Sequence, residues 1–335
     1  MKALIYTGVE ELAYEDRPRP VPAEGEALVR IMASGICGSD MHAFLGHDAR
    51  RPAPLTLGHE AAGLVVGGPR DGQRVTINPL VACQTCRDCK AHKQNLCAHR
   101  QIISMPPREG AFAEYVTIPE RNLVDVPETV DLKKAALAEP IACGWHAARL
   151  ARGVLGGDFV GKSCVVIGGG AIGVGAALSL RAQGARDITV IEPNPLRLAT
   201  LQRIEGFQAV APVDPDMPDD ASVDCVIDGV GFSGTRTTAC TLVRQGGVIA
   251  HIGLGDGEGG LDIRRMTLQE ITFIGTYTYT PVDFVETAEA IFDGRLGALD
   301  WIETRPLGAG QQAFSDIRAG HVASPKIVLI PDHTG

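Results

Sequence analysis

The sequence has few aromatic residues and a deficit of positive charge. Phenylalanine, tyrosine and tryptophan make up 5% of its 335 residues, and 31 lysines and arginines stand against 40 aspartates and glutamates, for a net charge of −9. Nucleic acids and anionic membranes bind basic surfaces, so we expect neither as the main partner. Hydrophobic residues at 45% and charged residues at 21% are ordinary for a globular protein and exclude wholesale disorder.

The sequence also lacks a clear targeting or membrane-spanning segment. The apolar run after Lys2 is four residues long, which is too short for a signal peptide, so we expect a cytoplasmic protein. Residues 163–180 form an uncharged stretch of eighteen, the length at which a membrane helix becomes a candidate. Five of those residues are glycine and three of the glycines are adjacent, which favours a turn over a membrane helix.

A length of 335 residues suggests two or three domains at roughly 100–200 residues each. Up to about residue 142 the chain has short strand-like runs broken by glycine and proline, which is typical of a small antiparallel barrel or sandwich. From residue 162, apolar strands alternate with longer helix-like stretches, which is typical of a parallel α/β sheet. We expect strands at 27–33, 63–66, 74–77, 113–118 and 122–126, then at 163–167, 188–191, 223–227, 248–252 and 271–275. The last strand, at 326–330, resembles the first part again, and Gly184 is expected to end the first helix of the second part.

A glycine-rich motif follows the first strand expected in the second part. Residues 164–173 read Cys-Val-Val-Ile-Gly-Gly-Gly-Ala-Ile-Gly, so Gly168, Gly170 and Gly173 fill the GxGxxG pattern of dinucleotide-binding folds. Ala171 and Ile172 open the following helix, whose N-terminus would receive the phosphates of the cofactor. The alternative is a glycine-rich turn that holds no cofactor.

The next expected strand ends in an acidic residue, Glu192, nineteen residues past Gly173. A carboxylate at this distance can hold the adenosine ribose hydroxyls and would repel a 2′-phosphate. The motif therefore predicts NAD rather than NADP. Arg197 could offset some of the repulsion, so some use of NADP is compatible with the sequence.

The nine cysteines make a poor disulfide framework, because the count is odd and no secretion signal is expected. Four of them have the spacing of a tetrahedral zinc site, namely Cys83, Cys86, Cys89 and Cys97. Four thiolates close the coordination sphere and leave no place for substrate, so this zinc would be structural. We interpret four others as small buried hydrophobic residues, namely Cys143, Cys164, Cys225 and Cys240.

A second set of metal-ligating residue types is dispersed along the chain. It comprises Cys37, His59, Glu60 and Glu139. Three or four such ligands with a vacant position would make a catalytic zinc site. Each also has an ordinary explanation, as a buried thiol, a loop histidine or a carboxylate at a helix end, and the spacing alone does not bring them together.

Together these motifs resemble those of the zinc-containing medium-chain dehydrogenases, the superfamily of alcohol, sorbitol and threonine dehydrogenases. The resemblance covers nearly the whole chain and rests on Cys37-Gly-Ser-Asp, Gly58-His-Glu60, the four-cysteine lobe, Ala138-Glu-Pro140 and the glycine motif, in that order. Glu60 and Glu139 in these motifs favour the sorbitol and threonine dehydrogenase branch of the superfamily. The fold implied is α/β, with a doubly wound Rossmann sheet at 143–275 inserted into a mainly-β GroES-like catalytic domain. That domain would take in 1–142 and 276–335, with the structural zinc lobe at about 80–100.

The resemblance also implies roles for individual residues. Cys37, His59 and Glu60 would bind the catalytic zinc, and Glu139 would be a fourth ligand or hold the zinc-bound water. Because one thiolate and two carboxylates outweigh the charge of Zn²⁺, we hypothesise that one glutamate is coordinated only transiently. Other implied positions are Asp40 behind the His59 ring, Ser39 and His42 as proton relay, Val230, Gly253 and Thr276 along the nicotinamide, and Lys326 at the pyrophosphate.

The activity implied is NAD-linked oxidation of a secondary alcohol, diol or sugar alcohol, in which zinc polarises the substrate hydroxyl. The resemblance further implies two zinc ions per chain and a homo-oligomer, a tetramer or dimer. Alternatives are a threonine-dehydrogenase-like activity on an amino-alcohol, a zinc-stabilised binding protein without turnover, and a zinc-free quinone-reductase relative.

Two departures from the family pattern, and one basic pair, bear on the substrate. Polyol dehydrogenases tend to carry Phe-Arg-Tyr where this chain has Tyr277-Thr278-Tyr279, and Ala43-Phe44 stands where they often have two large aromatics. Both changes weaken a sorbitol-type assignment. Arg50 and Arg51 precede the expected zinc ligands and could favour an anionic substrate, although a basic pair of this kind is more often a solvated loop.

Overall fold

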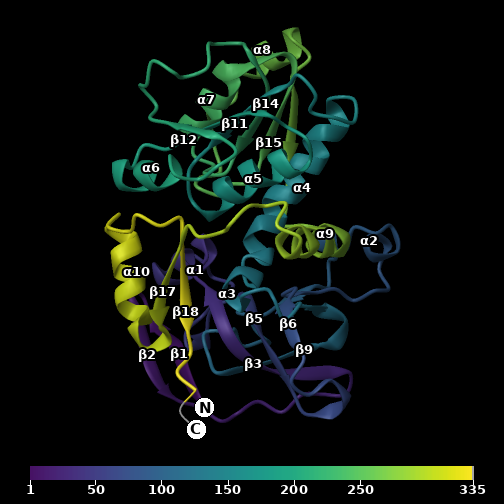
Figure 1. The fold of residues 1–335 in the computed structure, drawn as a ribbon, viewed down its shortest axis with the longest axis vertical. Coiled ribbons are helices and arrows are strands. Elements are labelled where there is room, and N and C mark those ends of the chain that lie inside the picture. Colours follow the sequence, from purple (N-terminus) through teal and green to yellow (C-terminus); the bar gives the residue numbers. More distant parts are fainter. Residues whose placement is uncertain (334–335) are drawn as a thin grey trace.

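The structure is a computed structural model that describes residues 1–333, and it has two halves that draw on different parts of the chain (Figure 1). One half holds the strands from β11 (Ser163–Ile167) to β16 (Thr272–Gly275) and the helices between them. The other half combines the residues before α4 (Ala138–Val154) with those after β16, and both chain ends lie in it. The α/β half is thus inserted into a β-rich half, as the predicted fold class requires.

The inserted half is built on a parallel six-stranded sheet in the order β13-β12-β11-β14-β15-β16. Its other strands are β12 (Asp187–Ile191), β13 (Gln208–Val210), β14 (Val223–Asp228) and β15 (Val243–His251), and its helices are α5 (Ala171–Ala182), α6 (Pro195–Leu201), α7 (Ser233–Leu242) and α8 (Ile263–Leu268). The central strands are apolar and buried on both faces, as parallel strands covered by helices must be. The chain runs outward from β11 to β13 and then returns to β14 on the other side of β11, which creates the switch point where such sheets bind ligands.

The β-rich half is built on a seven-stranded sheet in the order β10-β6-β5-β3-β18-β17, with β9 also paired to β3. The bounds are β3 (Glu26–Gly35), β5 (Glu60–Val66), β6 (Arg74–Ile77), β9 (Tyr115–Pro119), β10 (Leu123–Asp125), β17 (Ile302–Pro306) and β18 (Lys326–Ile330). A three-stranded sheet adds β1 (Lys2–Gly8), β2 (Glu11–Asp16) and β4 (Leu55–Thr56), and a two-stranded one adds β7 (Leu80–Val81) and β8 (Gln101–Ile102). Because β3 lies between β5 and β18, it brings the N-terminal motifs and the last strand to one place.

The helices of the β-rich half are short except for two near the C-terminus. They are α1 (Gly38–Phe44), α2 (Arg87–Lys90), α3 (Leu132–Ala135), α9 (Pro281–Phe292) and α10 (Gly310–Arg318). In the part of the chain that the structure describes, no helix is long and apolar enough to cross a membrane. The uncharged stretch at 163–180 forms β11, a turn and most of α5.

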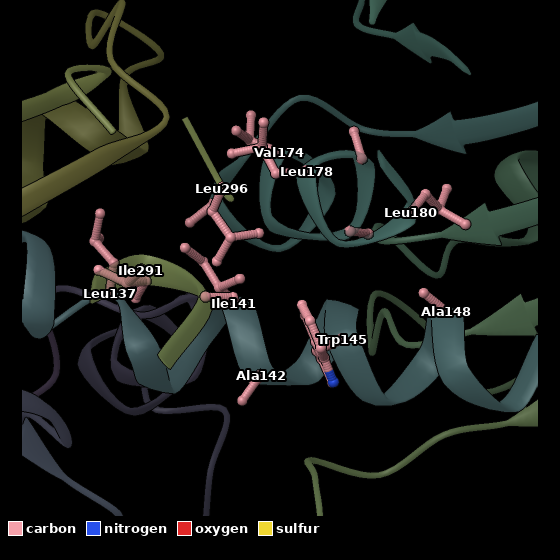
Figure 2. Packing of buried hydrophobic residues seen from close by; sticks show 14 of the residues in the cluster. Leu137, Ile141, Ala142, Trp145, Ala148, Val174, Leu178, Leu180, Ile291 and Leu296 are labelled. Atoms are coloured by element: carbon pink, nitrogen blue, oxygen red, sulfur yellow. The ribbon is translucent and has the colours of Figure 1, made fainter. Parts of the chain in front are cut away.

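Helix α4 joins the two halves and belongs to the core of both. Its side chains Ile141 and Trp145 lie in one apolar cluster with Val174 and Leu178 of α5 (Figure 2). The two helices approach closely because Gly144 has no side chain, and a Cβ there would lie 2.5 Å from the Cα of Ala176. The domain boundary proposed at residues 142 and 143 falls inside this continuous helix.

Candidate active site

The dispersed ligand types meet where β3, α1 and β5 come together. Cys37 lies between the end of β3 and the start of α1, while His59 and Glu60 stand at the start of β5. One ligand atom from each lies within 4.8 Å of the other two. Glu60 is paired across the sheet with Gly35, where a Cβ would lie 2.1 Å from Glu60 Oε2, so only glycine leaves room for the carboxylate.

His59 is held by two groups behind its ring. Its Nδ1 lies 3.5 Å from Oδ1 of Asp40 and 3.3 Å from the hydroxyl of Ser104. Asp40 is itself fixed, because it accepts hydrogen bonds from the backbone N–H groups of Cys37 and Gly58 at 3.0 and 3.2 Å. Burial alone would lower the pKa of His59, but the charges of Asp40 and Cys37 outweigh it and hold that pKa well above its usual value. With Nδ1 so occupied, the other ring nitrogen is left to bind a metal.

Glu60 has one satisfied and one free oxygen. Its Oε1 accepts a 2.7 Å hydrogen bond from the ammonium of Lys326, whereas its buried Oε2 has no hydrogen-bond partner. A buried, unpartnered carboxylate oxygen beside a thiol and an imidazole is the donor set that zinc prefers, so the residues present fit the metal. Lys326 also donates to the carbonyl of Ile36 at 2.6 Å. Lys326 therefore holds the carboxylate of Glu60 in place, and its expected contact with the pyrophosphate stays a prediction.

Glu139 lies next to this group in the first turn of α4. Its Oε1 accepts a 2.7 Å hydrogen bond from the hydroxyl of Tyr279, and both side chains are buried. Burial, reinforced by the charge of Glu60, raises the pKa of Glu139 to about 7. The compact three-residue group does not include Glu139, so its role as a fourth ligand stays a prediction. Sequence reasoning missed Tyr279 as a partner of Glu139, although the segment around it was already marked by its departure from the polyol enzymes.

The expected proton-relay residues share α1. Ser39 and His42 are three residues apart and therefore on one face of the helix, with Ser39 half-buried and His42 exposed. The carbonyl of Ser39 accepts a 3.2 Å hydrogen bond from Arg51. Arg51 is only 3% exposed and also donates to the carbonyl of Ser104 at 2.9 Å. The solvated-loop interpretation is therefore wrong for Arg51 and right for Arg50, whose side chain is 62% exposed.

The four clustered cysteines also converge. Their sulfur atoms all lie within 4.8 Å of one another, and Cys83 and Cys89 are separated by 3.9 Å. Tetrahedral zinc with zinc–sulfur bonds of about 2.3 Å requires sulfur atoms about 3.8 Å apart, so the cluster fits this ion. The thiols differ, because hydrogen bonds from Thr85 lower the pKa of Cys83 to about 5 while burial raises that of Cys89 to about 12. A dication would allow all four to ionise.

The glycine motif forms the turn between β11 and α5. Gly168 has a φ of 98°, and a Cβ on Gly173 would lie 1.7 Å from the Gly168 carbonyl oxygen, so both positions need glycine for the turn itself. Gly170 differs, because a Cβ there would meet no atom within 4 Å. The space beside Gly170 is the place where a cofactor pyrophosphate fits in such a turn.

Glu192 directly follows β12 and is anchored to the glycine turn. Its Oε2 accepts a 2.8 Å hydrogen bond from the backbone N–H of Gly169, and its Oε1 accepts one of 2.7 Å from Asn194. Arg197 lies 3.4 Å from the same carboxylate. The two residues expected at the adenosine ribose are therefore brought together at the edge of the glycine turn.

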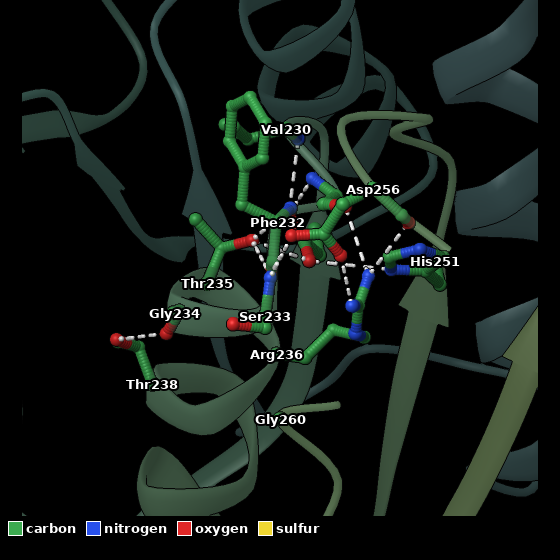
Figure 3. Close-up of polar contacts among 12 residues, drawn as sticks. Val230, Phe232, Ser233, Gly234, Thr235, Arg236, Thr238, His251, Asp256 and Gly260 are labelled. Carbon is green, nitrogen blue, oxygen red and sulfur yellow. Dashed lines mark hydrogen bonds and ion pairs between the residues drawn. The ribbon is translucent and has the colours of Figure 1, made fainter. Parts of the chain in front are cut away.

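The loops after β14 and β15 are organised by two buried residues that the sequence analysis did not single out, and Figure 3 shows one of them, Arg236, beside Asp256. Asp228 ends β14 and accepts hydrogen bonds from the N–H groups of Val230 and Gly231 at 3.0 and 2.9 Å. Arg236 of α7 donates to the carbonyls of Gly231 and Gly259 and pairs with Asp256. An acidic residue that ends a buried parallel strand is a signal that could have identified Asp228. Gly253 and Thr276, expected along the nicotinamide, lie at the carboxyl ends of β15 and β16 in the same region.

A fold of this kind, with a closed cysteine site, a Cys-His-Glu site and a dinucleotide turn, defines a zinc-dependent dehydrogenase. The chain belongs to the zinc-containing alcohol dehydrogenase family: residues 23–128 match the alcohol dehydrogenase GroES-like domain, and residues 171–293 match the zinc-binding dehydrogenase domain. It is an oxidoreductase that uses zinc and a nicotinamide cofactor.

Relatives of known name fall among the dehydrogenases of polyols and sugar acids. The chain is 33% identical to L-galactonate-5-dehydrogenase of Escherichia coli over 89% of each protein. It is 30% identical to a protein of Arthroderma otae named "Probable D-xylulose reductase A", over 95% of this chain and 94% of the relative. A structure from Sinorhizobium meliloti, assigned to the zinc-binding dehydrogenases and bound to NADP, superposes with a TM-score of 0.89 at 26% identity, covering 98% of this chain and 99% of that one.

Proposed function

We propose that the chain transfers hydride between NAD and a secondary hydroxyl of a polyol or sugar acid, with the ketone as the oxidised product. The observation that carries this proposal is the convergence of Cys37, His59 and Glu60 next to the helix that bears Ser39. Two relatives support the substrate class, because one is named for L-galactonate and the other for D-xylulose.

Each part of the site has a task in this reaction. A zinc ion held by Cys37, His59 and Glu60 would polarise the substrate hydroxyl, and bound NAD would take up the hydride from the carbon that bears this hydroxyl. The hydroxyl proton passes to Ser39 and then to His42, which is exposed and can release it to solvent. Ser39 is held for this role by the hydrogen bond from Arg51 to its carbonyl.

The carboxylate of Glu192 supports NAD as the preferred cofactor, because its charge opposes a 2′-phosphate. We propose that Glu139 is a fourth ligand or the residue that orients water at the metal. None of the nine cysteines forms a disulfide bond, which supports the cytoplasmic location that we propose. We also propose a homo-oligomer, since the outer edge of β16 pairs with no strand among residues 1–333 and such edges readily pair with another chain.

The test follows the absorbance of reduced nicotinamide when the protein is given NAD or NADP and one member of a panel of alcohols. Most members of the panel share one carbon skeleton. Galactitol, L-galactonate and galactitol 1-phosphate provide a neutral, a carboxylated and a phosphorylated member, and L-threonine tests the amino-alcohol alternative. Zinc content is measured on the same sample. Turnover with NAD at two zinc ions per chain supports the proposal, whereas no turnover on any member of the panel contradicts it.

A further inference from the structure

Ser104 is a fully buried serine that lies behind the ring of His59, just after β8. Its hydroxyl is 3.3 Å from Nδ1 of His59, which is closer than the 3.5 Å between that nitrogen and Oδ1 of Asp40. If a metal is bound at the other ring nitrogen, Nδ1 carries a proton and can share it between these two oxygens. One acceptor fixes which nitrogen is protonated but lets the ring pivot, whereas two acceptors also limit its rotation.

The backbone of Ser104 has a conformation that serine rarely adopts. Its φ is 69°, which lies in the left-handed region. Residues other than glycine keep such a conformation where the surrounding structure holds the backbone in place. The direction of the hydroxyl depends on this backbone, so whatever fixes the backbone of Ser104 also fixes its contact with His59.

The group that holds Ser104 is the guanidinium of Arg51, 53 residues earlier in the chain. Its Nε donates a 2.9 Å hydrogen bond to the carbonyl of Ser104. Its Nη1 donates to the carbonyl of Ser39 at 3.2 Å and to Oδ2 of Asp48 at 2.9 Å. The donors of a planar guanidinium point in fixed directions, so these bonds hold the two serines in one arrangement.

Arg51 is 3% exposed, and arginine is seldom buried to this degree unless it is paired. Its direct partner is Asp48, whose side chain is 8% exposed. Asp40 is a second acidic neighbour: burial would raise the pKa of Asp40, but His59 and, to a smaller degree, Arg51 hold that pKa below its usual value. Arg51 is therefore part of the interior of the site, in contrast to Arg50, whose side chain is 62% exposed.

We propose that Arg51 and Ser104 are positioning residues of the active site. Arg51 fixes the backbone of Ser104, and the Ser104 hydroxyl then holds the ring of His59 in the orientation that binds zinc. The same guanidinium holds Ser39, so one side chain places the zinc ligand and the proton-accepting hydroxyl relative to each other. This inference rests on the proposed function for the roles of His59 and Ser39. Arg51 and Ser104 act through these two residues and take no part in the chemical step.

The rate of zinc release, measured without substrate or cofactor, tests the role of Ser104. An excess of the chelating dye pyridylazoresorcinol is added to the zinc-loaded protein, and the coloured complex records the loss of both ions. The phase that is absent from Cys37→Ser belongs to the catalytic zinc, and the other phase is an internal reference. Ser104→Ala removes the hydroxyl and keeps the left-handed strain, whereas Ser104→Gly removes the hydroxyl and relieves the strain.

We expect the catalytic phase to become about tenfold faster in both Ser104 variants while the structural phase is unchanged, because a partner behind a ligating histidine contributes this much to metal affinity. Ser104→Gly should melt no lower than Ser104→Ala, since glycine accepts the left-handed backbone. A purely structural role predicts instead that zinc release follows stability and recovers in Ser104→Gly. Such a recovery, or an unchanged catalytic phase in both variants, overturns the inference.

Two matched controls separate this effect from general loosening of the fold. Ala221→Gly relieves left-handed strain at another position, where φ is 54°, on the surface of the inserted half. Ser179→Ala removes another fully buried serine hydroxyl, which donates to the carbonyl of Gly175 within α5. Both controls should keep the two native phases. An equal acceleration of the catalytic phase in either control would assign the effect to lost stability and overturn the inference.

A double variant tests the link through Arg51. Arg51→Lys keeps a positive charge near Asp48, but a single ammonium group cannot replace the fork that reaches both serine carbonyls. We expect Arg51→Lys to accelerate the catalytic phase, and to add nothing to Ser104→Gly, because Arg51 acts on the ligand through Ser104. Arg50→Gln alters the exposed partner of the same carboxylate and should leave both phases unchanged. Effects of Arg51→Lys and Ser104→Gly that multiply would overturn this route.

The same variants distinguish this inference from the proposed function. A native chain that shows both zinc phases but no turnover contradicts the proposed reaction, and the Ser104 variants still decide the inference. A native chain without a catalytic zinc phase overturns both. Where turnover is found, Arg51→Lys should lower kcat further than Ser104→Gly at saturating zinc, because it also releases Ser39. Equal kcat values would overturn the claim that Arg51 serves both serines.

Discussion

The ammonium of Lys326 and the carboxylate of Glu60 form a buried ion pair of 2.7 Å, with the two residues 4% and 0% exposed. Lys326 begins β18 and Glu60 begins β5, and both strands pair with β3. The last strand of the chain thereby delivers a positive charge to a carboxylate 266 residues earlier. The arrangement leaves the other oxygen of Glu60 free for a metal.

Removing the ammonium should destabilise the fold. We expect Lys326→Met to cost about 3 kcal/mol in the free energy of unfolding, because it leaves a buried carboxylate without its partner. Adding Glu60→Gln should recover part of that loss, since no charge then remains uncompensated. Urea denaturation of the isolated protein measures both. The control is Lys133→Met, which breaks an exposed pair with Asp131 and should cost less than about 1 kcal/mol; an equal cost for the two lysines contradicts the prediction.

The two metal sites should be separable by substitution. The native sequence should hold two zinc ions per chain, and Cys97→Ser should hold one, because the four-thiolate site cannot close without its buried fourth sulfur. Cys37→Ser should likewise hold one, but keep the structural ion. Elemental analysis of the purified proteins measures the content, and Cys240→Ser, which alters a buried thiol outside both groups, should keep two. Two zinc ions in the Cys97 variant would contradict the assignment.

A buried carboxylate should make the junction between α4 and α9 sensitive to acid. Asp283 binds His146 at 2.8 Å and Arg149 at 2.5 Å. Burial would raise the pKa of Asp283, but these hydrogen bonds outweigh it and lower that pKa below its usual value. A lowered pKa contributes stability above the unfolded pKa of about 3.9, and this contribution is lost as the pH falls further. Asp283→Asn should therefore cost about 3 kcal/mol at pH 7 and clearly less at pH 3.

Urea midpoints measured from pH 7 down to pH 3 test this. The matched control is Asp293→Asn, whose carboxylate forms an exposed pair with Arg295 and should show little effect at any pH. A gap between the native chain and Asp283→Asn that stays constant over this range would mean that the carboxylate is not the group that titrates.

Most of the strands next to the candidate site could be predicted from the sequence, because local patterns of apolar and turn-forming residues determine where such strands begin and end. The strands expected at 74–77, 163–167 and 326–330 have those bounds in the structure, and Gly184 follows α5 with a φ of 112°. Strands whose bounds depend on pairing with distant parts of the chain were predicted less well. The hairpin of β1 and β2 was not predicted, and β15 begins five residues earlier than expected because Val243 pairs with Val223 of β14.

The candidate site shows the same division. The residue types made Cys37 and His59 candidate ligands, and the family resemblance assigned them to one metal, which their separation of less than 4.8 Å fits. The partners that fix the ligands come from far along the chain and carry no local signature, as with Tyr279 beside Glu139 and Ser104 beside His59. The contact of Lys326 with Glu60 was not predicted for the same reason, because only the pairing of β18 with β3 places the two residues side by side.

Cofactor preference should depend on the charge of Glu192. Glu192→Gln keeps an oxygen for the N–H of Gly169 but removes the charge that opposes a 2′-phosphate. We expect the ratio of kcat/KM for NADP to that for NAD to rise by about tenfold or more, helped by Arg197, which lies 3.4 Å from the carboxylate. Glu205→Gln alters an exposed carboxylate of the same half and should leave the ratio unchanged. An unaltered ratio in Glu192→Gln would remove this residue from cofactor selection.

The glycine turn offers a way to separate cofactor binding from folding. Gly173→Ala should fail to fold properly, because its Cβ would lie 1.7 Å from the carbonyl oxygen of Gly168. Gly170→Ala should fold with an unchanged melting temperature, since a Cβ there meets no protein atom within 4 Å. The same Cβ would occupy the space for the pyrophosphate, so the affinity for NAD should fall by about tenfold or more. Thermal melts without cofactor and a fluorescence titration with NADH measure the two effects, and undiminished binding by Gly170→Ala would place the pyrophosphate elsewhere.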